Sequence, residues 1–332
     1  MSRTILMGDP RYFSVRGGAN PHTRNVVGIK KTVDAPRARQ QWHSMAKTLL
    51  AYSTEVLVVE PHEHLSGLVY PANAGFLYPL EGPPADRKTF HLANLLPTRA
   101  PEREVYRPFL RSLGLATSDI QARFEGEADF FPAGDYMLFT HGRIERQRFV
   151  PRLGLPPWKR IYGFRSDATA LDELTRIAGS RTILPLELTL EAHYHGDTVL
   201  CSFGRRREFL LAYMEGLAPR SREVLRAAFG VNLLPLPAAD AALYAANSFQ
   251  IEHDGRLFLL MPHGVSADLC RQLQERAVEP VLIDVSEFLA KGGGSIKCMI
   301  LDLGPSEELP SSPSVAAFRA ARSYQNLFPA QP

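Results

Sequence analysis

The chain has 332 residues, 45% hydrophobic and 22% charged, and no apolar run approaches the roughly 18 residues that a membrane-spanning helix needs. The formal net charge is +3 and is spread without blocks, so the sequence indicates neither a nucleic-acid partner nor a membrane. The amino end, MSRTILMGDPRYF, lacks the features of a secretory signal, and three cysteines make no disulfide framework. These features predict a cytoplasmic protein with free thiols.

Short apolar strands alternate with helical patterns along the chain, which predicts an α/β fold. In the second half the order of strand, strand, helix and strand recurs loosely, as in a repeat architecture. The expected elements are a strand at 4–9, a helix at 38–53, a strand at 55–61, a helix at 102–115, strands at 136–142, 181–188 and 197–204, a helix at 221–230, strands at 231–237 and 257–262, a helix at 267–277, and strands at 280–286 and 296–303.

Domain boundaries are weakly marked. Length alone favours about two domains. The only stretch dense in proline and serine is GPSEELPSSPS at 304–314, and a short helical pattern, SVAAFRAARSYQNLF, follows it.

A glycine run precedes the last cysteine in KGGGSIKCMILDL, residues 291–303. We expect a short helix from Ser286 to Lys291, a glycine loop, and a strand with Cys298 in its first residues. Glycines permit a close approach to the backbone, which predicts a thiol beside an open space. Two interpretations stay open: Cys298 is a buried small hydrophobe, or it is a nucleophile, which needs a base and a group that holds the base.

The segment HYHGDTVLCSFG, residues 193–204, offers a candidate base. His195 and Asp197 lie two residues apart at the head of an expected strand, so both are predicted to point to the same face. The alternatives are a core imidazole bonded to the backbone and a metal site formed by His193, His195 and Asp197. The absence of paired cysteines nearby argues against the metal.

The segment FEGEADFFPAGDYMLF, residues 124–139, offers three carboxylates just before another strand. Glu125, Glu127 and Asp129 lie in surroundings too apolar for a solvated face. Together with Asp197 they would form a pocket for a cation.

The segments FEGEAD, YHGDT and GGGSIKC, in this order and spacing, resemble the pentein superfamily of arginine deiminases, dimethylarginine dimethylaminohydrolases and amidinotransferases. MGDPRYFSVRGGANP, LVYPANAGF, YGFRSD and AANSFQI are also similar to successive signatures of that superfamily, particularly its bacterial amidinotransferase and dimethylarginine-hydrolase-like branch. The resemblance implies an α/β propeller of five ββαβ units around a central channel. It also implies one catalytic domain over residues 1–332, in which 304–332 form a Pro/Ser-rich segment and a short terminal helix.

The same resemblance implies roles for individual residues. Cys298 would be the nucleophile, His195 the general acid and base, and Glu125 the carboxylate that orients the imidazole. Asp197 would bind the guanidinium nitrogens, and Asp129 would belong to the same acidic wall.

Two further positions match substrate-binding positions of the superfamily. Arg165 would grip the substrate carboxylate, although it also fits an exposed arginine at a strand end. Asn73 matches an asparagine of arginine dihydrolases, although it also fits a turn.

One position departs from the superfamily pattern. Relatives commonly carry a Pro-Asp pair whose aspartate clamps the guanidinium, where this chain has Ser66 and Gly67. Either Glu127 and Asp129 compensate, or the substrate is a substituted or less cationic guanidine, or binding is weak.

We therefore expect a hydrolase that acts on the guanidino C–N bond of arginine or a substituted guanidino compound through a covalent thiouronium on cysteine. The alternatives are an amidinotransferase that passes the amidino group to an amine, and a non-catalytic binding protein of the same fold. The sequence implies no cofactor and no metal, and a small guanidino compound as its partner. It leaves the oligomeric state open, and a homo-oligomer is compatible with the resemblance.

The remaining reactive or charged residues have structural interpretations. Cys201 and Cys270 are expected to be packing positions. Arg99 and Arg103 are expected to form surface ion pairs with nearby glutamates. The run Arg205–Arg207 is expected to be a basic turn between strands.

Overall fold

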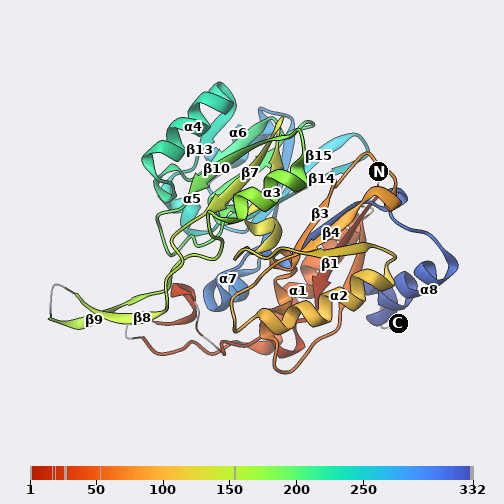
Figure 1. Ribbon diagram of the computed structural model, residues 1–332, viewed down its shortest axis with the longest axis horizontal. Coiled ribbons are helices and arrows are strands. Elements are labelled where there is room, and N and C mark those ends of the chain that lie inside the picture. Colours follow the sequence, from red (N-terminus) through yellow and green to blue (C-terminus); the bar gives the residue numbers. More distant parts are fainter. Residues whose placement is uncertain are drawn as a thin grey trace.

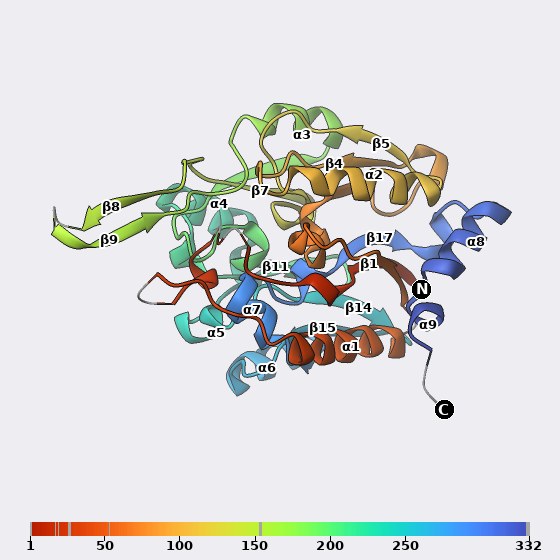
Figure 2. The same cartoon turned by 90° about the horizontal axis from the view of Figure 1, so that it is seen from below.

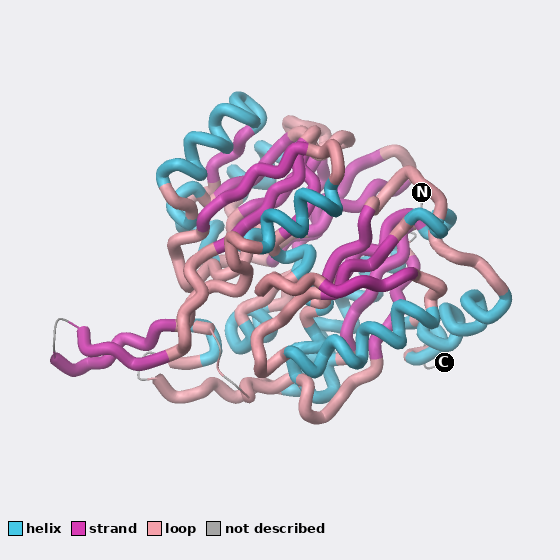
Figure 3. The backbone as a smooth tube through the Cα atoms, viewed as in Figure 1, coloured by secondary structure: helices cyan, strands magenta, loops and turns pink. Residues whose placement is uncertain are grey.

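A computed structural model of the chain describes residues 2–16, 18, 20–25, 28–52, 54–152 and 155–329. Within those residues the strands form five three-stranded sheets and a separate two-stranded ribbon. Helices lie on the outer side of the strands (Figures 1 and 3). The expected α/β class and the five repeated units are confirmed.

The five sheets share one pattern, in which an antiparallel strand pair is followed by a helix and a third, parallel strand. The unit of β3 (Gly75–Tyr78), β4 (Thr89–Leu92), α2 (Arg103–Ser112) and β5 (Ala116–Asp119) shows it directly, because β3 pairs antiparallel and β5 parallel with β4. Three more units are β6 (Phe130–Ala133), β7 (Tyr136–His141), α3 (Ala170–Ala178) and β10 (Thr182–Glu187); β11 (Leu200–Phe203), β12 (Phe209–Ala212), α4 (Pro219–Phe229) and β13 (Leu233–Pro235); and β14 (Phe249–His253), β15 (Arg256–Pro262), α6 (Ala267–Gln274) and β16 (Val278–Ile283).

The fifth unit joins the two ends of the chain. β17 (Leu301–Pro305) pairs antiparallel with β1 (Arg3–Gly8), and β2 (Glu55–Val59) pairs parallel with β1 after the crossover helix α1 (Ala35–Ala51). Arg3 binds both carboxylate oxygens of Asp302 across this junction, at 3.2 and 2.7 Å. The N-terminal and C-terminal strands therefore complete one ββαβ unit between them.

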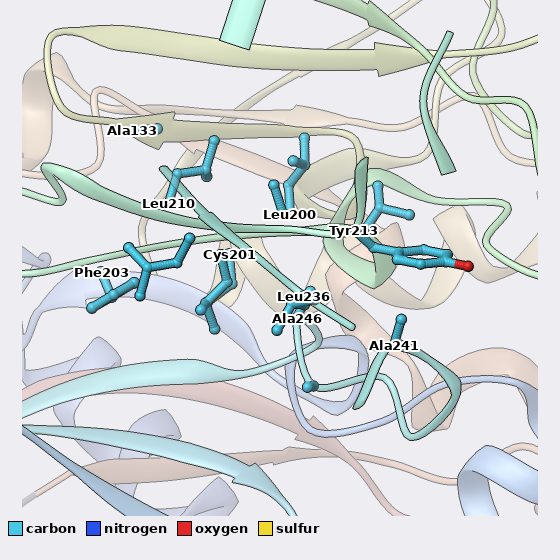
Figure 4. Packing of buried hydrophobic residues seen from close by; sticks show 14 of the residues in the cluster. Ala133, Leu200, Cys201, Phe203, Leu210, Tyr213, Leu236, Ala241 and Ala246 are labelled. Atoms are coloured by element: carbon cyan, nitrogen blue, oxygen red, sulfur yellow. The ribbon is translucent and has the colours of Figure 1, made fainter. Parts of the chain in front are cut away.

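Apolar periodicity explains why the helices pack on the sheets. In α1 the side chain of Asp34 caps the first turn, and Trp42, Met45 and Leu49 form one buried stripe. Figure 4 shows the packing around β11, where Leu200, Cys201 and Phe203 lie among the buried residues of the neighbouring elements. The expectation that Cys201 is a packing position is confirmed.

Several elements were not expected from the sequence. β8 (Arg148–Arg152) and β9 (Leu155–Ile161) form a hairpin that projects from the body of the molecule (Figures 1 and 2). Prolines within RFVPRLGLPPWKRI conceal the strand pattern, and a two-stranded ribbon tolerates them because its outer edges need no ladder partner. The short helix α5 (Ala238–Ala242) was likewise not expected, whereas α7 (Ser286–Gly292) lies where a short helix was expected.

The C-terminal segment contains two helices where one was expected, α8 (Pro313–Arg322) and α9 (Tyr324–Leu327). Ser323 ends the first and caps the second. Arg319 forms an ion pair of 2.7 Å with Glu55, which fastens α8 to the first sheet. The interpretation of residues 1–332 as one domain stays a prediction.

Short turns at the centre of the molecule precede the first strands of the units. Four are single 3-10 turns at Pro71–Asn73, Gly126–Ala128, Gly196–Thr198 and Lys297–Met299, and neighbouring ones among them contact one another. The motifs identified in the sequence lie on these turns, so the repeat of the fold brings distant motifs together. No helix in the described ranges is long and apolar enough to cross a membrane.

Candidate active site

The central turns surround a cavity of about 340 Å³. Five of the seven residues selected from the sequence line it: Asn73, Glu125, Arg165, His195 and Cys298. All five are buried. The cavity therefore brings together a thiol, an imidazole, a carboxylate, a guanidinium and an amide from segments that are far apart in the sequence.

Cys298 lies on the 3-10 turn Lys297–Met299, just before β17, rather than inside the strand as expected. Its side chain is 3% exposed, and its thiol donates a hydrogen bond of 3.4 Å to Asp197 Oδ2. Burial raises the pKa of the Cys298 thiol well above its ordinary value, and the charge of Asp197 raises it further. The thiol is therefore protonated at neutral pH when no ligand is bound.

Asn247 holds the nucleophile turn in place. Its Oδ1 accepts hydrogen bonds from the backbone N–H groups of Ser295 and Cys298, at 3.2 and 3.1 Å. Its Nδ2 donates to Cys298 Sγ over 3.1 Å. An amide donor stabilises a thiolate more than a thiol, so Asn247 partly offsets the rise in the Cys298 pKa that the charge of Asp197 causes.

His195 and Glu125 form a buried pair. His195 Nε2 donates to Glu125 Oε2 over 2.9 Å. Burial alone would lower the pKa of His195, but the carboxylates of Asp129 and Glu125 outweigh burial and raise it. Burial opposes ionisation of Glu125, yet the hydrogen bond and charge of His195, with Arg99, lower the pKa of Glu125 to about 2. The imidazole therefore keeps its proton to a higher pH than usual. Its Nδ1 has no partner among the described residues, so this nitrogen is available to exchange a proton with a substrate.

Asp129 supports this pair from behind. Its Oδ1 accepts from Thr140 Oγ1 at 2.6 Å and from the Gly196 N–H at 2.9 Å, and its Oδ2 accepts from Ser166 Oγ at 2.6 Å. These contacts engage both oxygens, and Asp129 is not among the described residues that line the cavity. Its position fits a residue that fixes the turn after His195 and stabilises the positive charge of the imidazole.

His195 and Asp197 do not lie on a strand, so the alternation that placed both side chains on one face does not apply here. Residues on alternate positions share a face only in a strand, and here they flank and enter a 3-10 turn, whose period is three. Asp197 borders a neighbouring cavity instead, yet its carboxylate touches the Cys298 thiol. Burial raises the pKa of Asp197 to about 6, and its Oδ1 has no partner among the described residues.

Arg99 is not a surface residue, contrary to expectation. It lines the cavity and forms a two-pronged ion pair with Glu102, at 2.9 and 2.7 Å. It also donates to Asn73 Oδ1 over 2.8 Å, which orients the Asn73 amide so that Nδ2 lies 3.5 Å from His195 Nε2. The sequence shows a helical pattern after Arg99, but no local signal indicates that the Arg99 side chain points into the cavity.

Gly67 provides the space that the Arg99–Glu102 pair occupies. A Cβ atom added at Gly67 would lie 2.2 Å from Glu102 Oε1 and 2.6 Å from Arg99 Nε. A side chain at this position, including aspartate, would displace the pair and with it the hydrogen bond to Asn73. Glu127 faces the neighbouring cavity, so neither it nor Asp129 replaces a carboxylate at position 67.

Arg165 lies on the wall of the cavity against an aromatic ring. Its guanidinium carbon is 4.8 Å from the centre of the Tyr194 ring, and its Nη1 donates to Gly163 O over 3.1 Å. The residue is 3% exposed, so the alternative of an exposed arginine at a strand end is excluded. A planar guanidinium held in this way is suited to a carboxylate.

The glycine run before Cys298 makes room for Tyr70. A Cβ atom added at Gly294 would lie 2.4 Å from the Tyr70 ring and 3.0 Å from the Cβ of Cys298. The ring can therefore pack against the chain only where side chains are absent. Helix α7 ends at Gly292, close to the expected position.

His193 is a core imidazole rather than part of a metal site. Its Nδ1 donates to Thr198 O over 3.2 Å, and burial lowers its pKa to about 4. In the part of the chain that is described, no group of three or more His, Cys, Asp or Glu side chains is arranged to hold a metal ion.

The chain is similar in sequence to known proteins. The family model described as "N,N dimethylarginine dimethylhydrolase, eukaryotic" matches residues 159–304. An N(G),N(G)-dimethylarginine dimethylaminohydrolase of Mycobacterium tuberculosis is 28% identical over 304 residues, which cover 92% of this chain and 87% of that protein.

Solved structures show the fold. The product-bound N-terminal domain of ArgZ, an arginine dihydrolase of cyanobacteria, superposes with a TM-score of 0.75 at 21% identity, covering 91% of this chain and 98% of that one. An adduct of dimethylarginine dimethylaminohydrolase with S-methyl-L-thiocitrulline superposes with a TM-score of 0.65 at 16% identity, covering 91% and 100%. At these identities the likeness concerns the five-bladed α/β architecture alone.

Proposed function

Since this chain belongs to the pentein superfamily, we propose that it is a hydrolase of guanidino C–N bonds that works through a covalent thiouronium on Cys298. The observation that carries the proposal is the single cavity shared by Cys298, His195 and Glu125, with Asp197 touching the thiol. This set supplies a nucleophile, a proton carrier and a carboxylate that orients it.

Substrate binding prepares the nucleophile. A guanidinium carbon within bonding reach of Cys298 Sγ brings its nitrogens close to the Asp197 carboxylate, which lies 3.4 Å from the sulfur. The substrate cation offsets the negative charge of Asp197, which lowers the pKa of the thiol, and Asn247 stabilises the resulting thiolate. Asp197 accepts the thiol hydrogen bond and passes the proton on to solvent, so its carboxylate is ionised when it holds the guanidinium.

The first chemical stage forms the covalent intermediate. The thiolate attacks the guanidinium carbon to give a tetrahedral adduct. Protonated His195 donates its proton to the departing nitrogen, the C–N bond breaks, and ammonia or an alkylamine leaves. A thiouronium remains on Cys298 and His195 is neutral.

The second stage releases the product. Neutral His195 takes one proton from a water molecule and the water oxygen attacks the thiouronium carbon. As the C–S bond breaks, the remaining hydroxyl proton passes to the departing sulfur. The products are a ureido compound and the regenerated sulfur, and Glu125 stabilises the imidazolium each time it forms.

The charges of the cavity favour a substituted arginine or a related guanidino acid over plain arginine. Arg165 is placed to bind a carboxylate at the far end of the substrate. The carboxylate beside Gly67 is that of Glu102, which Arg99 already neutralises, so it offers no clamp for an unsubstituted guanidinium on that side. A guanidine with an alkyl substituent demands fewer hydrogen-bond acceptors there.

An amidinotransferase remains the second candidate, because it shares the thiouronium and differs only in the acceptor. The test incubates the protein with arginine, methylated arginines and other guanidino acids, with and without amine acceptors, and measures ureido product, released amine and transferred amidine together. We expect ureido product without an acceptor, and faster turnover of an N-methylated arginine than of arginine. Product that forms only when an amine acceptor is present would replace the hydrolase with the transferase.

A further inference from the structure

A second cavity, of about 280 Å³, lies beside the candidate active site. The two cavities share no lining residue among those described, and neighbouring residues of the same motifs line different cavities. The motif residues that line the active-site cavity are Glu125, His195 and Cys298, and those that line the second cavity are Glu127, Asp197 and Lys297.

Two carboxylates at the floor of the second cavity are held in ion pairs. Lys297 Nζ pairs with the Glu127 carboxylate, and Asp302 is held by both prongs of Arg3. Asp197 is engaged by the Cys298 thiol on the other side. Glu127 and Asp302 are thus paired with cations, whereas Asp197 contacts a neutral thiol and has no cationic partner among the described residues.

The mouth of the cavity is basic. It carries Arg181, which lies just before β10, and the three consecutive arginines 205–207 of the turn between β11 and β12. Arg205 and Arg206 have acidic neighbours, Glu252 at 3.3 Å and Asp135 at 3.7 Å. Arg181 donates only to a backbone carbonyl, that of Gly134, among the described residues. The side chain of Arg207 makes no hydrogen bond or ion pair within that part of the chain. Two guanidinium groups at the mouth are therefore not neutralised.

The side chain of Arg181 and the backbone of Arg207 both lie beside Gly134 on the rim. Arg181 Nη2 lies 2.7 Å from the carbonyl oxygen of Gly134, and the carbonyl oxygen of Arg207 lies 3.8 Å from where a Cβ of Gly134 would be. Arg207 has a φ of 55°, a left-handed conformation that glycine or asparagine adopts at lower cost. A strained residue at a cavity mouth is a common mark of a binding function.

The walls between mouth and floor are apolar. Met137, Leu200 and the aromatic rings of Phe130 and Phe249 line the cavity, alongside the hydroxyl groups of Ser202 and Ser248. Both hydroxyl groups already donate to backbone carbonyls. The cavity thus offers a basic rim and an apolar interior of a size suited to a small molecule.

We propose that this second cavity binds a small organic anion, with a carboxylate or phosphate head between Arg181 and Arg207 and an apolar body against Phe130 and Phe249. Two guanidinium groups of this kind bind planar or tetrahedral oxyanions through charge-assisted hydrogen bonds. Burying the apolar body adds affinity that an inorganic anion lacks. The proposed anion site lies at the rim and does not include Cys298 or His195, although Asp197 borders the cavity and also contacts the Cys298 thiol. The proposal stands whether or not the proposed hydrolase activity does.

Calorimetric titration of the whole protein with three probes tests the site: inorganic phosphate, phenyl phosphate and benzylamine. We expect phenyl phosphate to bind about tenfold more tightly than inorganic phosphate, and benzylamine not to bind. Arg207→Gln and Arg181→Gln should each weaken phenyl phosphate binding by about tenfold or more. Equal affinity of phosphate and phenyl phosphate, or no binding of either, would overturn the proposal.

Three variants distinguish binding at this rim from binding elsewhere on the protein. Arg205→Gln removes an exposed, paired arginine of the same turn and should leave the affinity nearly unchanged. Arg165→Gln removes one guanidinium group of the active-site cavity. If this variant lost phenyl phosphate binding, the ligand would lie in the active site and the proposal would be refuted. Arg207→Gly relieves the left-handed backbone, so it should weaken binding without lowering the unfolding temperature. Unchanged affinity in Arg207→Gly would exclude the role of this arginine.

Discussion

Cys298→Ser is expected to reduce turnover of every guanidino substrate by roughly 10⁴-fold or more while the fold survives. A serine hydroxyl at this position does not ionise near neutral pH, and His195, whose pKa is raised by Asp129 and Glu125 despite its burial, holds its proton and does not serve as a base for the hydroxyl. The hydroxyl can still accept from Asn247 and donate to Asp197, the two side-chain contacts that the thiol makes. The measurement compares turnover with the thermal unfolding curve of the same preparation.

Cys270→Ser and Cys201→Ser are the matched controls. Cys270 is half-buried on α6, and Cys201 is buried in an apolar cluster and is not among the residues that line the active-site cavity. Both variants should keep their turnover, although Cys201→Ser should unfold at a lower temperature because it buries a hydroxyl. Full activity in Cys298→Ser would disprove the nucleophile, and collapse of its fold would favour a packing role.

Glu125→Gln is expected to lower the maximal rate by about 10³- to 10⁴-fold, an effect of the size seen when the carboxylate behind a catalytic histidine is neutralised. The amide keeps the shape of Glu125 but no longer stabilises the imidazolium of His195. Because the pKa of His195 is raised by Asp129 and Glu125, removing one of these charges lowers it. The protonated form that delivers the proton to the leaving nitrogen is then lost at a lower pH.

The pH profile of the residual activity therefore distinguishes this role from general damage. The alkaline limb of the rate should move to lower pH in Glu125→Gln. Glu127→Gln changes a carboxylate two residues further on that faces the other cavity, and it should leave the alkaline limb where it is. An unmoved limb in Glu125→Gln would mean that this carboxylate does not act through His195.

The fold follows from the sequence wherever hydrophobic periodicity is strong. The helices at α1, α2, α4 and α6 and the strands β1, β2, β7, β10 and β15 lie where the pattern predicts them. The hairpin β8–β9 was missed because its prolines hide the alternation, and β3 and β4 were missed because each has only four residues. Short strands leave too few positions for a period to appear.

The candidate site was recognisable in part because its residues lie in local motifs. Cys298, His195, Glu125, Asn73 and Arg165 were selected from such motifs, and they line one cavity. The roles proposed for them stay predictions until they are tested by substitution. The cytoplasmic location and the homo-oligomer stay predictions as well.

What the sequence could not provide is the direction of each side chain at the centre. Asp197 was assigned to the face of His195 by the strand rule, whereas the intervening backbone is a 3-10 turn. Arg99 was assigned to the surface because an arginine near a glutamate usually forms an exposed pair, whereas Gly67 leaves room for the pair inside. Asn247 lies in AANSFQI, a segment that resembled a superfamily signature, but its contact with the thiol depends on a residue 51 positions away.

The central claim is that a guanidino carbon becomes bonded to the sulfur of Cys298. Mixing the protein with substrate, quenching with acid within one turnover and locating the added mass by peptide mass spectrometry tests it directly. We predict an amidino adduct on the peptide that contains Cys298, and none on those that contain Cys201 or Cys270. An adduct on either of the other two cysteines, or turnover with no adduct at any time point, would contradict the account.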